Sequence, residues 1–131
     1  MTHPYFDRIS YSQARTEIAH AQDAITEATG QQPVFVRAPR GATTPDSRRA
    51  MKDSGLTPAG WSICIEHHAS PTPEAMASRV LAAVKPGAII LMHDGRLDRS
   101  RSIQALRILL TALDHEGYTV TTLSDLVSMG T

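Results

Sequence analysis

The feature that most constrains the fold of this chain is a regular alternation between helical segments and short apolar segments. Helix patterns occur in five segments, residues 10–30, 44–55, 72–84, 102–117 and 124–129. Apolar runs of strand length separate them, at residues 34–36, 59–65, 88–93 and 118–123. Because strands that alternate with helices form parallel β-α units, we expect an α/β fold whose strands are covered on both faces.

The ends of the helices are marked by capping residues. Ser10 and Gln13 have the spacing of a capping box, and Gly30 is a typical helix stop. Thr44 and Thr72 each precede a proline, which predicts two further helix starts, and Ser124 is the expected cap of the last helix. In the segment 102–117, the periodicity predicts that the inward face carries Ile103, Leu106, Leu110 and Leu113.

Bulk composition excludes several classes of protein. The 131 residues suit one domain, and 13 basic residues balance 13 acidic ones, so no electrostatic affinity for nucleic acid is expected. No apolar run reaches the length of a membrane span, and no signal peptide is visible at the start. The one cysteine, Cys64, excludes an internal disulfide.

Polar clusters follow three of the apolar runs, as "RAPRG", "EHH" and "HDG". Chemistry in parallel sheets gathers at the carboxyl ends of strands, so these clusters are the candidate site. His93 would act there as a general acid or base, or it would only hold a loop by a hydrogen bond. Arg37 would bind an oxyanion, or it would only form a structural salt bridge. The residues alone leave both pairs of alternatives open.

The order and spacing of these segments resemble a known family. "THPY", "RAPRG", a strand tryptophan and above all "VKPGAIILMHDG" followed by "GYTVTTLSDLV" are similar to the polysaccharide deacetylases, also called NodB-homology or carbohydrate esterase family four domains. The resemblance covers nearly the whole chain, but only the C-terminal two-thirds of the family's domain. It implies one domain over residues 1–131, a partial, distorted (β/α) barrel that lacks its first strands.

The resemblance also implies an activity and a cofactor. The family removes acetyl groups from carbohydrate polymers such as peptidoglycan, chitin or xylan, using zinc or another divalent metal. One aspartate and two histidines hold that metal, a second aspartate is the base, and a histidine late in the chain is the acid. The partner it implies is therefore a carbohydrate polymer.

Carried over residue by residue, the resemblance assigns roles to six positions. His3 is the second histidine of the metal motif, with Met1 and Thr2 in the two places before it and the first histidine just before the chain start. Arg37 orients the base and His93 is the general acid. The expected substrate-binding residues are Arg40, Trp61 and Leu91, with Arg40 in the place of an aromatic residue whose backbone N–H helps to bind the oxyanion.

Two departures from the family pattern accompany these assignments. Cys64 and His67 stand where acidic residues are common, which leaves the acidic partner of His93 unassigned. The motif Thr-Phe-Asp-Asp-Gly is absent, and the sequence contains no Asp-Asp pair. We therefore expect a chain that is inactive alone, and the alternatives are a carbohydrate-binding module without catalysis or a gene remnant. If the assignments hold, His93, Arg37 and His3 converge at the open end of the strands.

Overall fold

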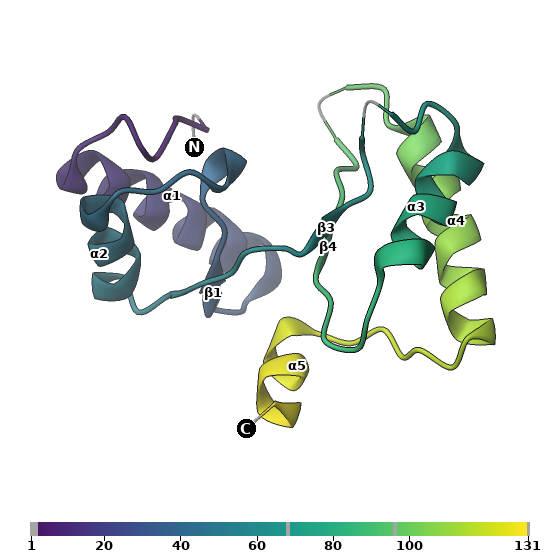
Figure 1. The fold of residues 1–131 in the computed structure, drawn as a ribbon. Coiled ribbons are helices and arrows are strands. Elements are labelled where there is room, and N and C mark those ends of the chain that lie inside the picture. Colours follow the sequence, from purple (N-terminus) through teal and green to yellow (C-terminus); the bar gives the residue numbers. More distant parts are fainter. Residues whose placement is uncertain (1–2, 68, 96, 131) are drawn as a thin grey trace. The chain divides into compact units, whose positions relative to one another are not determined.

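The computed structural model describes residues 3–67, 69–95 and 97–130, so Met1 and Thr2 of the metal motif lie outside the described residues. The chain divides into two compact units, Met1–Gly60 and Trp61–Thr131. Each unit contains one pair of parallel strands with helices, which confirms the α/β class (Figure 1). No helix in the described part of the chain is both long and apolar enough to cross a membrane.

The first unit packs two helices with one short pair of strands. Helix α1 (Tyr11–Thr29) starts at the predicted capping box of Ser10 and ends at Gly30, which has a left-handed φ of 70°. Helix α2 (Pro45–Asp53) starts at Thr44, as predicted. Strand β1 (Phe35–Val36) pairs in parallel with β2 (Thr57–Pro58), and a short 3-10 turn, η1 (Pro39–Gly41), follows β1. The core is made by Phe6, Ala14, Ile18, Ala38, Ala50, Met51 and Leu56.

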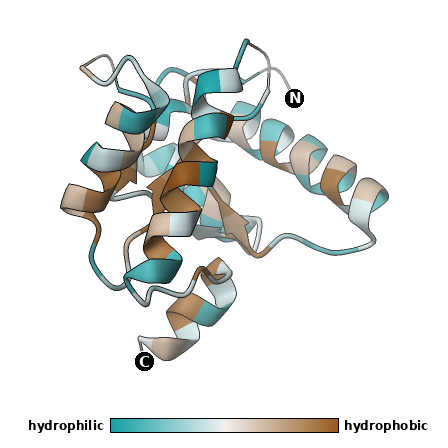
Figure 2. Cartoon of the chain, turned by 90° about the vertical axis from the view of Figure 1, so that its right-hand side faces the viewer, coloured by the Kyte–Doolittle hydropathy of each residue, from teal (hydrophilic) through white to brown (hydrophobic). Residues whose placement is uncertain are grey.

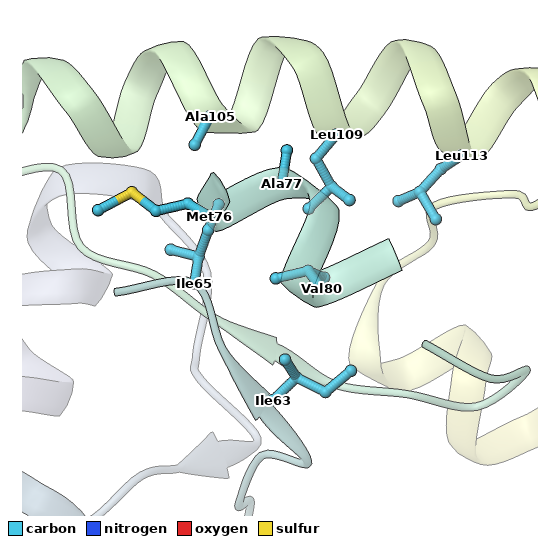
Figure 3. Close-up of a cluster of buried hydrophobic side chains, with 8 residues drawn as sticks. All are labelled: Ile63, Ile65, Met76, Ala77, Val80, Ala105, Leu109 and Leu113. Atoms are coloured by element: carbon cyan, nitrogen blue, oxygen red, sulfur yellow. The ribbon is translucent and has the colours of Figure 1, made fainter. Parts of the chain in front are cut away.

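The second unit packs two helices against its pair of strands. Strand β3 (Ile63–Cys64) pairs in parallel with β4 (Ile90–Leu91). Helix α3 (Pro73–Ala83) starts at Thr72, as predicted, and lies beside α4 (Ser100–His115). Their facing sides and β3 form one core of eight buried residues (Figure 3): Ile63, Ile65, Met76, Ala77, Val80, Ala105, Leu109 and Leu113. Helix α5 (Leu123–Met129) ends the described part of the unit.

Strands β1, β3 and β4 consist of hydrophobic residues, whereas the helices carry both hydrophobic and hydrophilic residues (Figure 2). The residues of these three strands are buried or half-buried, as expected for strands covered by helices, but both residues of β2 are exposed. One strand departs from the prediction. Val34, expected in a buried strand, is 54% exposed and lies outside β1, whose two residues are half-buried.

Three sequence predictions in the second unit are wrong, the first of them in part. On α4, Leu113 is buried as predicted, but the rest of the inward face is formed by Ser102, Ala105 and Leu109, whereas the predicted Ile103 and Leu110 are 39% and 42% exposed. No strand forms over residues 118–123, all of which are described, and Val120 there is 67% exposed. Helix α5 is capped by Thr122, which accepts a hydrogen bond from the Asp125 N–H, instead of by Ser124.

Candidate functional site

The parallel pairing of β3 and β4 brings Glu66 and His93 together. The register places Cys64 opposite Leu91, and Glu66 and His93 each lie two positions farther along their own chain segments. The Ile65 N–H donates to the Leu91 carbonyl at 2.8 Å, so the pairing continues one residue beyond the strand. Because alternate residues of an extended segment share a face, Glu66 and His93 project toward the same side.

Glu66 contacts His93 through both of its carboxylate oxygens. Oε1 accepts the backbone N–H of His93 at 2.9 Å, and Oε2 lies 3.3 Å from Nδ1 of the imidazole ring. An ionised carboxylate only accepts hydrogen bonds, so the proton between them lies on Nδ1 and Nε2 remains available for proton exchange. The His93 side chain is 45% exposed and that of Glu66 is 20% exposed, so a half-buried carboxylate holds an accessible ring.

Other polar groups of the same unit also surround the Glu66 carboxylate. The Ser102 hydroxyl donates to Oε1 at 3.2 Å, the Cys64 thiol donates to Oε2 at 3.5 Å, and Nη1 of Arg99 lies 4.0 Å from Oε1. Burial raises the pKa of the Cys64 thiol, which therefore stays protonated and keeps its role as a donor. The carboxylate is held in place from several sides, which fixes the orientation of the imidazole.

Arg79 of α3 holds the backbone that leads into Glu66. Its guanidinium donates to the carbonyl of Cys64 and, at 3.2 Å, to the carbonyl of Ile65. Its Nε is buried and has no hydrogen-bond partner among the described residues. A guanidinium pointing at two successive carbonyls restrains the chain directly before the acidic residue, so Arg79 is a positioning residue for the Glu66–His93 pair.

Glu66 is also expected to make stability depend on pH. Burial, the largest single influence, raises the pKa of its carboxyl, but hydrogen bonds from the His93 backbone, the His93 ring and Cys64 outweigh burial, and the pKa lies below its ordinary 4.5. A lowered pKa adds stability above the ordinary value and loses it as pH falls through the folded-state value. Replacing Glu66 with glutamine should therefore cost about 1 kcal/mol at neutral pH and progressively less in acid.

The measurement is urea unfolding of both proteins at pH values from about 7 to 3, followed through the fluorescence of Trp61, the only tryptophan in the chain. Glu74→Gln removes the same charge from an exposed position in the first turn of α3 and serves as the matched control. A stability difference between wild type and Glu66→Gln that stays constant over the whole pH range would contradict the assignment.

The remaining predicted site residues divide between the two units. His3, Arg37 and Arg40 belong to the first unit, and all three are exposed. Trp61 and Leu91 belong to the second, where Trp61 is half-buried and Leu91 is only 8% exposed. His93 belongs to one unit and Arg37 and His3 to the other, so their convergence stays a prediction.

Glu66 belongs to the predicted cluster "EHH", but the sequence analysis gives it no role. The family pattern predicts acidic residues at the positions that Cys64 and His67 occupy. The signal that would have found Glu66 is strand register, since it follows Cys64 by the same two residues by which His93 follows Leu91. The acidic partner of His93 is thus present, displaced by two positions from Cys64.

Comparison with known proteins connects this arrangement to a family. A family model described as polysaccharide deacetylase matches residues 1–59. The chitooligosaccharide deacetylase of Bradyrhizobium sp. (strain ANU 289) is 33% identical over 132 residues, which cover 92% of this chain and 60% of that protein. These matches support a polysaccharide deacetylase domain in this chain. It spans about 60% of the length of the rhizobial relatives that it matches.

Other members of the polysaccharide deacetylase family are similar over the same part of the chain. The peptidoglycan-N-acetylglucosamine deacetylase of Listeria monocytogenes is 29% identical, over 95% of this chain and 25% of that protein. The structure of a family 4 acetyl xylan esterase from Clostridium thermocellum, with a cobalt ion, is 28% identical with a TM-score of 0.87, over 98% of this chain and 61% of that one. The structure of a family 4 pseudoenzyme from Bacillus anthracis is 26% identical with a TM-score of 0.85, over 95% of this chain and 43% of that one.

The described residues do not form a metal site like the one that the polysaccharide deacetylase family implies. No three side chains of histidine, cysteine, aspartate or glutamate cluster closely enough in the described part of the chain to hold an ion. His3 is exposed and has a left-handed φ of 59°. Since a catalytic metal needs about three protein ligands, no step of the chemistry below is assigned to a metal held by this chain alone.

Proposed function

We propose that this chain supplies the proton-donating part of a carbohydrate deacetylase that acts on a polymer of N-acetylated sugars. The observation that carries the proposal is the contact of Glu66 with both the backbone and the ring of His93. The names of the relatives support an acetylated amino sugar as substrate, because they are chitooligosaccharide and peptidoglycan-N-acetylglucosamine deacetylases. The proposal includes a single domain over residues 1–131 that forms part of a (β/α) barrel.

In the proposed reaction, a water oxygen adds to the carbonyl carbon of the acetamide and the carbon–nitrogen bond then breaks. The departing amine needs a proton, and Nε2 of His93 donates it while Glu66 stabilises the imidazolium through Nδ1. Arg37 would orient the base, Leu91 would border the acetyl methyl group, and Trp61 would contact the substrate. His3 would be one ligand of zinc or another divalent metal, whose chemistry is to polarise the acetyl carbonyl.

The complete site needs a base and a metal carboxylate, and the sequence has no Asp-Asp pair to provide them. We therefore expect the chain alone to release no acetate from chitopentaose with added zinc or cobalt. A chimera with the preceding part of the Bradyrhizobium enzyme fused before Met1 is expected to release acetate in a chelator-sensitive reaction. Hydrolysis by the chain alone would contradict the first expectation, and an inactive, folded chimera would contradict the proposed function.

A second candidate function is carbohydrate binding without catalysis. The similarity to a family 4 pseudoenzyme favours it, together with the lack of a three-ligand cluster among the described residues. Binding of chitopentaose that survives both a chelator and His93→Ala, in a chimera that releases no acetate, would select this candidate. Binding that either change abolishes would exclude it.

A further inference from the structure

Two arginines of the first unit stack on one exposed tyrosine. The guanidinium carbon of Arg8 lies 4.6 Å from the centroid of the Tyr5 ring, and that of Arg40 lies 4.4 Å from the same centroid. The electron-rich ring face attracts both cations and holds them in place. Because both distances are measured to one centroid, the same tyrosine ring holds both positive charges. Tyr5 is 37% exposed and both arginines are exposed, so a ligand can reach them.

Neither of these arginines forms an ion pair with any residue that the structure describes. Another arginine of the same unit offers a direct comparison. Arg49 stacks on Tyr11 at 4.4 Å, but it also lies 3.4 Å from a carboxylate oxygen of Asp46. The stack on Tyr11 is thus neutralised by its own chain, whereas Arg8 and Arg40 present two like charges that an anionic ligand would neutralise.

The backbone holds Arg40 in a conformation that is unusual for its residue type. Its φ is 57°, in the left-handed region that side chains other than glycine seldom adopt. The turn is closed by the Gly41 N–H, which donates to the Ala38 carbonyl at 2.9 Å. Such conformations are concentrated at functional sites, because surrounding contacts must maintain them. The turn and the stack on Tyr5 together restrict where the Arg40 guanidinium lies.

We propose that Arg8 and Arg40, arranged on Tyr5, bind the carboxylate of an acidic amino sugar, so that this chain prefers a glycan with carboxylate-bearing residues over a neutral one. A guanidinium presents a planar set of N–H donors that matches a carboxylate in a two-point contact, and stacking on tyrosine leaves the N–H edges free. This inference rests on the proposed function, which gives a glycan as the ligand, and it adds that the glycan is negatively charged.

The test compares two disaccharides of equal ring number by NMR titration of the 131-residue chain. One is N-acetylglucosamine linked to N-acetylmuramic acid, which carries one carboxylate, and the other is neutral chitobiose. We expect the acidic disaccharide to bind about tenfold more tightly, and we expect Arg8→Gln or Arg40→Gln to remove most of that preference. The preference should also weaken between about 20 and 300 mM sodium chloride, because salt screens exposed charges.

Arg49→Gln is the matched control, since it removes a stacked arginine that already has a carboxylate partner and should leave the preference intact. Equal binding of the two disaccharides, no detectable binding of the acidic one, or a preference unchanged in folded Arg40→Gln would each overturn the proposal. The titration measures binding without hydrolysis, so its result is independent of the test of deacetylase activity. A preference for the acidic disaccharide in a protein that releases no acetate would support the carboxylate site alone. Acetate release without that preference would support the proposed function alone.

Discussion

Replacing Leu109 with alanine is expected to lower the free energy of unfolding of the second unit by about 3 kcal/mol, while Leu110→Ala should cost less than about 1 kcal/mol. The two leucines are neighbours on α4, yet Leu109 is 1% exposed and Leu110 is 42% exposed. Leu109 contributes to the core that also contains Val80 and Ala77 (Figure 3), so its loss leaves a cavity between α3 and α4. Removal of Leu110 mainly changes contact with water.

Urea unfolding followed through the fluorescence of Trp61 measures this difference within the second unit. The pair is its own control, because the two substitutions delete the same atoms from adjacent positions and have the same effect on helix propensity. Equal losses for the two variants would contradict the burial of Leu109 alone, and a larger loss for Leu110→Ala would show that the face predicted from periodicity is the buried one.

The contrast between these leucines shows why the sequence predicts where helices start better than it predicts which helix face is buried. The caps at Ser10, Thr44 and Thr72 act within one turn, so local sequence is enough to place them. The buried face of α4 instead depends on what lies opposite. Ala105 and Ser102 are small and add little to an apolar pattern, yet they are buried where α4 faces its neighbours.

Strands were harder to place because a strand exists only where a partner accepts its hydrogen bonds. Thr57–Pro58 has no strand-like pattern, but it pairs with Phe35–Val36, whose partner could not be known from local sequence. Residues 118–123 have an alternating pattern and form no strand in the described structure. Glu66 was missed for the same reason, since its contact with His93 follows from the register between β3 and β4.

The substitution His93→Ala in the chimera is expected to lower kcat for acetate release by about 10²–10³-fold, with a small change in KM. The imidazole is 45% exposed and held by Glu66, which suits a group that gives its proton to the departing amine after the substrate has bound. Glu66→Gln should have a smaller effect, about tenfold, because glutamine still occupies the space but no longer stabilises the imidazolium.

Added imidazole is expected to restore part of the rate of the His93→Ala chimera, since it can enter the space left by the ring and donate the missing proton. His115→Ala removes an exposed histidine from the last turn of α4 in the same unit and is the matched control, with an expected rate close to that of the unmodified chimera. If folded His93→Ala keeps more than about a tenth of the rate, the departing amine receives its proton from another group, and the Glu66–His93 contact only stabilises the fold.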